Sequence, residues 1–599
     1  MHEHREGAGV KVNTPLEEYA MIGDAETAAL VSKTGSIDWL CLPRFDSPAC
    51  CTALLGTPDH GHWSIAPDGD IVETAHRYRP DTLILETDLT VRAGTIRLTD
   101  FMPIRSGNPV VIRIVTGLEG SVPTRLDACF RFDYGNMPPW ASKTEDGALL
   151  HVGPDEVLLQ GTTALEIDNN ALKAAFTVDE DTRHVFVLTY GTQERTHDIE
   201  HAEKILKDTE TFWRKWIGRF DRAVPHADAV RRSLITLKAL IHQPTGGLVA
   251  ALTTSLPEQP GGSMNWDYRY CWLRDATFTL TALVECGYLA EATAWRDWML
   301  RAVAGEPDKM KIVYRVDGSR RLDEAELPWL PGYRYARPVR IGNAAAAQLQ
   351  LDVYGELIRS LHAAERAGME RTEQGRHIEH AIVRHVAKIW IEPDQGLWES
   401  RGEPRHYVYS KVMAWAAIDS FLKGKGGGEL DTREREGLKE LRDRIHAVVC
   451  REGFDPGIGS FTSYFGGQEV DASLLLLPKV GFLEATDKRM AGTIERIERI
   501  LVADGLVRRH RMDALVPEGA FVACSFWLAE CQVRQGRRAD AAKTIERALS
   551  IGSELGFLSE EYDVASKRLC GNYPQALSHL ALIHAVLALD QLDRSDDAR

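Results

Sequence analysis

The sequence lacks the features that would place the protein on a membrane or on nucleic acid. No apolar run approaches the length of a membrane span, and the N-terminal stretch MHEHREGAGVKVNTP has no apolar signal segment. Asp and Glu number 87 against 71 Lys and Arg, a net charge of −16, and no basic run is interleaved with aromatics. We therefore expect neither membrane nor nucleic acid as a partner.

Paired cysteines and compact metal-ligand motifs are also missing. The ten cysteines include no CxxC pair, and the adjacent Cys50 and Cys51 could be bridged only with strain. Free thiols in a reducing cytoplasm are the interpretation that this pattern favours. Twenty histidines form no HExxH set, and no Walker-type loop is present. We expect no metal and no cofactor.

The length of 599 residues exceeds what one small core can organise, so at least two domains are expected. Period-two alternation with closely spaced turns runs through the first third, for example at 27–41, 83–101 and 184–190. This pattern predicts an antiparallel β-sandwich over residues 1–195. A helical period follows, and we place a linker helix and domain boundary at 196–227.

Residues 228–599 read as a second domain made of helices, with little strand signal. Several of its helical patterns are apolar around much of their circumference, as the inner helices of a two-layer ring would be. The predicted helices cover 228–242, 276–286, 289–304, 343–367, 377–390, 409–422, 432–450, 471–480, 488–504, 518–535, 538–555 and 574–589.

The loops of the helical part share an unusual composition. They read NWDYRYCWLRD (265–275), LPGYRYARPVRIGN (330–343), RRHRMD (508–513) and SEEYD (559–563). Aromatic rings pack on the apolar faces of sugars, and Arg and carboxylate side chains hydrogen-bond hydroxyl groups. In any single loop these residues could be ordinary core and surface. Their repetition in four loops favours a sugar site, for a small neutral substrate.

Two carboxyl groups with different surroundings stand out. Glu399 follows Trp398 in a polar loop, where desolvation by the indole would keep a general acid protonated. Most Trp-Glu pairs are only a core anchor beside a solvated charge, so a partner is needed. Glycoside hydrolysis requires a second carboxyl that stays ionised, and Glu560 or Glu561 could supply it.

The order of motifs resembles glycoside hydrolase family 15. The motifs are NWDYRYCWLRD, GYRYARPVRIGN, GLWESRG with YSKVMAW, EGAFVACSFWLAE, SEEYD and GNYPQALSH. The segment EYAMIGDAETAALVSKTGSIDWLCLPRFDSP is similar to the trehalase-like N-terminal domain of bacterial members. The resemblance implies an (α/α)6 barrel after the β-sandwich, and an inverting hydrolase that releases glucose from α-glucosides.

The resemblance also assigns roles. Glu399 falls on the family's general acid and Glu560 on its general base, with Glu561 beside it. Only geometry separates those two candidates. The family's substrate-binding positions fall on Tyr268, Trp272, Arg274, Asp275, Trp398 and Arg509, and Arg337 is a further candidate in its loop.

Two departures bear on the substrate. The chain has Ser400 where fungal glucoamylases have a second acid, and Tyr335 where they have a Trp. Both positions touch the leaving-group side, which favours trehalose over starch. Hydrolysis of α-1,4- or α-1,6-gluco-oligosaccharides, as in a glucoamylase or glucodextranase, is the alternative. A non-hydrolytic carbohydrate-binding protein or a lyase would be another class, against which the two glutamates argue. A homo-oligomer is left open.

Overall fold

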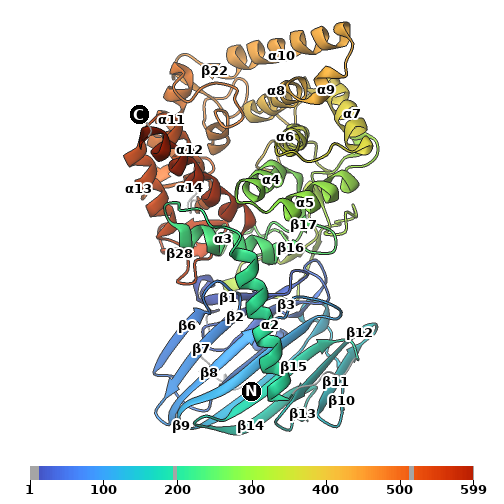
Figure 1. Ribbon diagram of the computed structural model, residues 1–599, viewed down its shortest axis with the longest axis vertical. Coiled ribbons are helices and arrows are strands. Elements are labelled where there is room, and N and C mark those ends of the chain that lie inside the picture. Colours follow the sequence, from blue (N-terminus) through green and yellow to red (C-terminus); the bar gives the residue numbers. More distant parts are fainter. Residues whose placement is uncertain (1–12, 193–197, 512–517, 598–599) are drawn as a thin grey trace, which may run out of the picture.

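The computed structural model describes residues 13–192, 198–511 and 518–597. Figure 1 shows a β-domain at one end of the molecule, a helical domain at the other, and helix α2 (Ile199–Ile217) running along the side between them. The predicted order of an antiparallel β-domain followed by a helical domain is confirmed, although short two- and three-stranded sheets lie between the helices.

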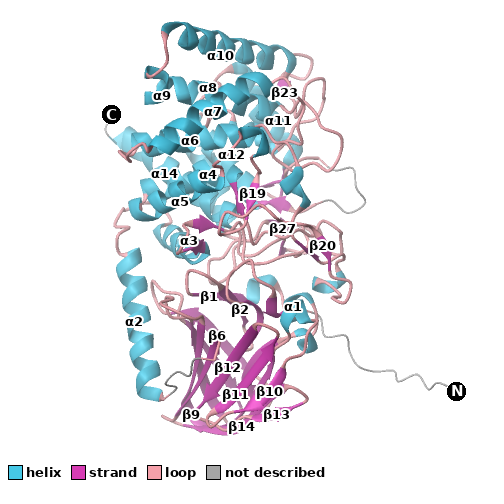
Figure 2. Cartoon of the chain, turned by 90° about the vertical axis from the view of Figure 1, so that its right-hand side faces the viewer, coloured by secondary structure: helices cyan, strands magenta, loops and turns pink. Residues whose placement is uncertain are grey.

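The β-domain consists of antiparallel strands in two sheets that share the long strand β9 (Figure 2). Ile65 and Leu126 of one sheet and Leu98 and Leu159 of the other belong to the same buried core. The strands are β1 (Tyr19–Gly23), β2 (Ala28–Ser32), β3 (Ser36–Cys41), β4 (Ala49–Cys51), β5 (His62–Pro67), β6 (Glu73–Tyr78), β7 (Leu85–Val91), β8 (Gly94–Phe101), β9 (Val110–Cys129), β10 (Trp140–Lys143), β11 (Gly147–Val152), β12 (Asp155–Gly161), β13 (Glu166–Asp168), β14 (Ala171–Asp179) and β15 (Arg183–Tyr190).

Strand β9 spans 20 residues and runs through both sheets. Its first half pairs with β8 and β15, and its second half pairs with β5 and β14, so it passes from one sheet to the other. Gly117, Gly120 and Pro123 lie where it changes sheets. Gly and Pro weaken the strand signal of a sequence, and local pattern does not show that β-partners exist on both sides.

The helical domain forms a two-layer arrangement. Helices α8 and α12 are buried around nearly their whole circumference, whereas α10 buries only Ile445 and Val449 and lies outside. The helices are α3 (Ala227–Leu240), α4 (Ala276–Glu285), α5 (Leu289–Ala302), α6 (Asp352–Arg366), α7 (Glu373–Ile389), α8 (Val408–Lys423), α9 (Lys425–Gly428), α10 (Thr432–Glu452), α11 (Lys488–Leu501), α12 (Val522–Arg534), α13 (Arg538–Leu549) and α14 (Ala576–Asp597). Within the described ranges, no helix combines the length and the apolarity needed to cross a bilayer.

Several predicted helices, among them those at 343–367 and 538–555, are shorter than their periodicity suggested, and two of the differences change the kind of element. The stretch 471–480 forms only a 3-10 turn, Ala472–Leu476, which Asp471 caps by accepting from the Ser473 amide at 2.7 Å and which Pro478 follows. The stretch 518–535 begins as strand β26 (Ala520–Phe521), which pairs with β27 (Glu561–Asp563) before α12 starts. Both differences lie beside the site described below.

Buried side chains join the two domains. The indole of Trp39 in β3 donates to the carbonyl of Leu252 at 3.0 Å. Arg269, fully buried, donates to Ser47 O and Tyr134 Oη of the β-domain, each at 2.8 Å, and pairs with Asp267. Since Asp267 and Arg269 flank Tyr268, the β-domain contacts the segment that carries a predicted site residue.

Stability of the β-domain should depend on the buried pair of Arg113 and Asp100, whose Nε–Oδ1 distance is 2.8 Å and whose side chains are 0% exposed. Arg113→Met leaves a buried carboxylate unpaired and should cost roughly 3–5 kcal/mol of unfolding free energy. Arg125→Met is the matched control: its pair with Asp68 is exposed and is worth about 0–1 kcal/mol. Urea unfolding followed by circular dichroism measures both, and equal losses would contradict the expectation.

Candidate active site

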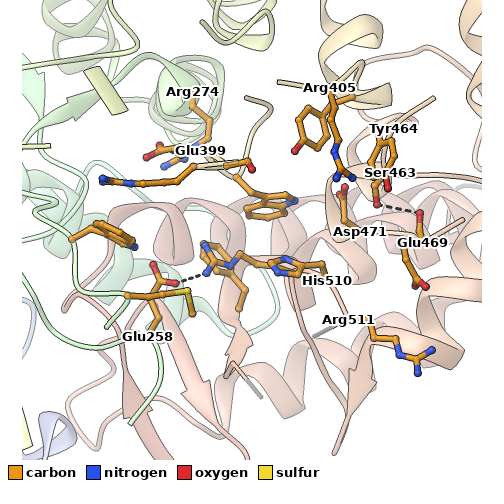
Figure 3. Close-up of a pocket in the computed structure, with 18 of the residues that line it drawn as sticks. Glu258, Arg274, Glu399, Arg405, Ser463, Tyr464, Glu469, Asp471, His510 and Arg511 are labelled. Atoms are coloured by element: carbon orange, nitrogen blue, oxygen red, sulfur yellow. Dashed lines mark hydrogen bonds and ion pairs between the residues drawn. The ribbon is translucent and has the colours of Figure 1, made fainter. Parts of the chain in front are cut away.

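A cavity of about 650 Å³ opens among the loops of the helical domain (Figure 3). Every described residue that lines it lies between Glu258 and Phe521. Tyr268, Arg274, Trp398, Glu399 and Arg509 of the predicted site are among these residues. The β-domain loop at residues 132–140 reaches Arg269 through Tyr134 and does not line the cavity.

Glu399 lies in the loop between α7 and α8, in a backbone conformation (φ = 55°) that few non-glycine residues adopt. Its amide donates to Gly396 O at 3.1 Å, and Gln348 Nε2 donates to its carbonyl at 3.1 Å. The carboxyl Oε1 accepts from Trp272 Nε1 at 2.6 Å and from Arg274 Nη1 at 3.0 Å. The side chain is fixed in direction and 14% exposed.

Burial raises the pKa of Glu399 above the ordinary glutamate value, although the Arg274 charge and the Trp272 hydrogen bond act in the opposite direction. Desolvation outweighs them because the surrounding loops exclude water. A carboxyl of this kind holds its proton at higher pH than an exposed glutamate does.

The segment 265–275 supplies one wall of the cavity. Strand β18 (Cys271–Trp272) pairs with β19 (Val313–Tyr314), and α4 begins directly after Asp275. Tyr268 and Arg274 line the cavity. Trp272 and Asp275 lie behind the wall: Trp272 orients Glu399, and Asp275 Oδ1 accepts from Arg274 Nε at 3.2 Å. In this structure both residues contact other site residues, and their contact with substrate stays a prediction.

Glu560 and Glu561, at the start of β27, are both completely buried but differ in surroundings. Glu560 Oε2 accepts from the Asn572 amide at 3.2 Å. Burial raises the pKa of Glu560, while Arg509, the Asn572 amide and the Tyr268 hydroxyl oppose that rise. Glu561 lies against Glu518, and burial together with that negative charge raises its pKa well above the ordinary value. Glu560 does not line the cavity itself; the Tyr268 side chain that hydrogen-bonds it does.

Arg509 is the centre of a cluster of three buried carboxylates. Its guanidinium hydrogen-bonds Glu518 and Glu258 and lies 3.4 Å from Glu561 Oε1. Carboxylate oxygens of the three glutamates lie within 4.8 Å of one another, a spacing that could also hold a cation. Here the positive charge between them is the guanidinium of Arg509.

Sequence reasoning missed Glu258 and Glu518. Glu258 belongs to a Pro- and Gly-rich loop, SLPEQPGG, that carries no recognisable motif. Glu518 stands in EGAFVAC, which contributed to the family resemblance without a role of its own. Their importance depends on Arg509, a contact across 251 residues in the case of Glu258.

The structure does not place Arg337 at the cavity. Its side chain is exposed and borders a separate depression with Glu326 and Leu327. Arg340 of the same loop borders that depression as well; its guanidinium lies 4.6 Å from the centre of the Trp266 ring, and its amide donates to Ser255 Oγ at 2.7 Å. Contact between Arg337 and the substrate stays a prediction.

The cavity has two ends. Figure 3 shows Arg274, Glu399 and Glu258 at one end, and Arg405, Tyr464, Glu469 and Arg511 at the other. The second end is polar and is built from the loops that precede α8 and η8 (Ala472–Leu476) and from the segment after Arg509. Ser400 lines the cavity, whereas Tyr335, the other departure seen in the sequence, is 65% exposed and does not.

Family models match most of the chain. Residues 224–551 match glycosyl hydrolases family 15, and residues 5–213 match the trehalase-like N-terminal model. The protein belongs to glycosyl hydrolases family 15 and is a glycoside hydrolase.

Named relatives can be aligned with nearly the whole chain. A trehalase of Thermoplasma volcanium is 34% identical, over 96% of this chain and 94% of its own length. A trehalase of Mycobacterium tuberculosis is 37% identical, over 98% and 91%. Among solved structures, a bacterial glucoamylase complexed with acarbose has a TM-score of 0.69 at 13% identity, covering 99% of this chain and 98% of that chain. That likeness shows the two-domain fold, with its (α/α)6 barrel.

Proposed function

We propose that the protein is a trehalase, which hydrolyses α,α-trehalose to two glucose molecules with inversion at the anomeric carbon. The observation that carries the proposal is the Glu399 carboxyl, which Trp272 and Arg274 hold at the cavity with a raised pKa. Identities of 34% and 37% with two trehalases, over nearly the full length of the chain, support trehalose as the substrate.

Glu399 acts as the general acid. Trp272 and Arg274 both donate to Oε1, which leaves Oε2 free of those two contacts and able to carry the proton to the glycosidic oxygen. Because the pKa is raised, the carboxyl keeps this proton at higher pH than an exposed glutamate would. Arg274 then stabilises the carboxylate that forms when the proton leaves.

Glu560 acts as the general base. A base must be ionised, and the Asn572 amide, the Tyr268 hydroxyl and Arg509 all favour its carboxylate form. Glu561 is the weaker candidate, because Glu518 beside it favours the neutral acid. Oε1 of Glu560 is buried and has no hydrogen-bond partner among the described residues, so it can accept from the attacking water. In an inverting reaction that water stands between base and sugar, with the two carboxyls roughly 6.5–9.5 Å apart.

The two ends of the cavity match the two halves of a disaccharide. The cavity volume of about 650 Å³ lies within the range for small-ligand sites. The glucose unit whose anomeric carbon is attacked binds at the end with Arg274 and Glu399. The leaving glucose occupies the polar end with Arg405, Tyr464 and Glu469, whose charged and hydroxyl groups hydrogen-bond sugar hydroxyls.

The test is incubation with trehalose, maltose, isomaltose and soluble starch, followed by NMR of the released glucose. We expect turnover of trehalose, with one β-glucose and one α-glucose appearing initially because only the attacked carbon inverts. Release from maltose or isomaltose but not from trehalose would replace the proposal with a glucoamylase or glucodextranase activity. No glucose from any of the four would favour the binding-protein or lyase alternative.

The pH dependence of kcat/KM should be a bell displaced upward from the ordinary glutamate pKa of about 4.3. Activity falls with rising pH as Glu399, whose pKa is raised, loses its proton. Activity falls with decreasing pH as Glu560, whose pKa is also raised, gains one. Initial rates on trehalose well below KM measure both limbs. α-Glucosyl fluoride needs no protonation to leave, so its profile should lack the alkaline limb; an unchanged limb would contradict the assignment to Glu399.

A further inference from the structure

Glu258 is a charged residue of the cavity wall that the mechanism above does not use. It lines the cavity, only 1% of the residue is exposed, and its Oε2 accepts from Arg509 Nη2. Its other oxygen, Oε1, is buried without a hydrogen-bond partner among the described residues. A buried polar atom without a partner costs about 1–3 kcal/mol, so such an atom beside a ligand cavity indicates a ligand group.

The loop that carries Glu258 holds it firmly in place. The Glu258 amide donates to Met264 O at 3.2 Å, which closes the turn around Gly261 and Gly262. Ser255 Oγ donates to Arg340 O at 2.8 Å and fixes the loop to its neighbour. Arg509 anchors the carboxyl end. A side chain fixed at both ends presents its remaining oxygen in one direction, as a specific contact requires.

Position and charge indicate what the ligand group is. Figure 3 places Glu258 across the cavity from Arg274 and Glu399, at the end proposed for the released glucose. Burial raises the pKa of Glu258 well above the ordinary value, and the nearby Glu560 adds to the rise. A neutral carboxylic acid has both a donor and an acceptor, which suits a sugar hydroxyl and leaves no uncompensated charge.

We propose that Glu258 is a further substrate-binding residue, which hydrogen-bonds one hydroxyl group of the glucose unit bound beside Glu399. This inference rests on the proposed function, because it takes a terminal glucose as the ligand at that end. It adds a carboxyl whose task is recognition rather than proton transfer in the reaction.

Glu258→Ala should lower kcat/KM for trehalose about 10- to 100-fold, the loss expected for one hydrogen bond to a buried group. Glu258→Gln keeps a hydrogen-bond donor and an acceptor, so its kcat/KM for trehalose should fall by less than about 5-fold. The matched control is Glu356→Gln: Glu356 is equally buried, and its Oε2 also lacks a hydrogen-bond partner among the described residues, but it does not line the cavity. Its kcat/KM should stay within about threefold of the wild-type value, since Glu356 lies outside the cavity wall.

Trehalose analogues that lack one hydroxyl at a time distinguish a direct contact from a structural effect. With the wild-type enzyme, kcat/KM for one analogue should be about 10- to 100-fold lower than for trehalose. With Glu258→Ala, kcat/KM for that analogue should be no more than about twofold lower than for trehalose. If every analogue loses the same factor with both enzymes, Glu258 does not bind a hydroxyl and the proposal is overturned. If Glu258→Ala lowers kcat alone, and this effect is the same for every analogue, Glu258 holds the attacking water instead. That result would also overturn the proposal.

Glucose binding provides a readout that does not require hydrolysis. Isothermal titration calorimetry with glucose should show about tenfold weaker binding to Glu258→Ala and unchanged binding to Glu356→Gln. If Glu258→Ala fails to fold, Glu258→Asp, which withdraws the carboxyl by one methylene, should give the same pattern. Wild-type protein that binds glucose with this pattern but does not cleave trehalose would support Glu258 while refuting the trehalase proposal. Unaltered glucose binding in the Glu258 variants would refute the Glu258 contact alone.

Discussion

Glu399→Gln is expected to lower kcat on trehalose by about 10²–10⁴-fold, the contribution typical of a positioned general acid. The amide has the shape of the carboxylic acid and its oxygen can still accept from Trp272 and Arg274, which contact the carboxyl at 2.6 and 3.0 Å. It cannot release a proton to the glycosidic oxygen. KM should therefore change little, and steady-state kinetics separates the two parameters.

Two comparisons make this result specific. Glu403→Gln alters an exposed glutamate of the same loop and should keep wild-type turnover. α-Glucosyl fluoride leaves without protonation, so Glu399→Gln should retain most of its activity on that substrate. Wild-type turnover of trehalose by Glu399→Gln, or an equal loss on both substrates, would show that Glu399 is not the proton donor.

Glu560→Gln should have a loss of similar size, about 10²–10⁴-fold in kcat, but with a different signature. Water must still be deprotonated when fluoride is the leaving group, so both substrates should be affected equally. The Asn572 amide, 3.2 Å from Oε2, can still donate to the amide oxygen, which preserves the fold around β27.

Glu561→Gln is the decisive control for this second prediction. The two glutamates are adjacent and equally buried, and Glu561 lies against Glu518, where it favours the neutral form. The variant therefore replaces a neutral acid with a neutral amide and should cost less than about tenfold. A large loss for Glu561→Gln together with a small loss for Glu560→Gln would exchange the proposed roles of the two residues.

Much of the cavity could be predicted because its residues occur in short, contiguous motifs. Tyr268 and Arg274 lie in one segment of eleven residues, and Trp398 and Glu399 are adjacent. The helical period of the flanking segments showed that these motifs are loops, and loops of a helical ring meet at one end. The general positions of the helices followed from the same periodicity.

What could not be predicted depends on contacts between distant segments. Glu258 and Glu518 matter because both reach Arg509, and no local pattern encodes that meeting. Arg337 and Arg340 occupy the same loop with the same chemistry, and no local pattern shows that both border a depression separate from the cavity. The sheet change of β9 depends in the same way on partners far along the chain.

The contacts of Arg269 limit how this protein can be engineered. Cys41, Ser47 and Tyr134, from the β-domain, and Asp267, from the helical domain, all accept hydrogen bonds from one fully buried guanidinium. Separating the domains, or exchanging one of them for a relative's, would expose a buried charge two residues from Asp267 and next to Tyr268. A chimera would have to import Arg269 and its four partners as one set. The boundary between the domains, which α2 follows, is therefore a poor site for recombination.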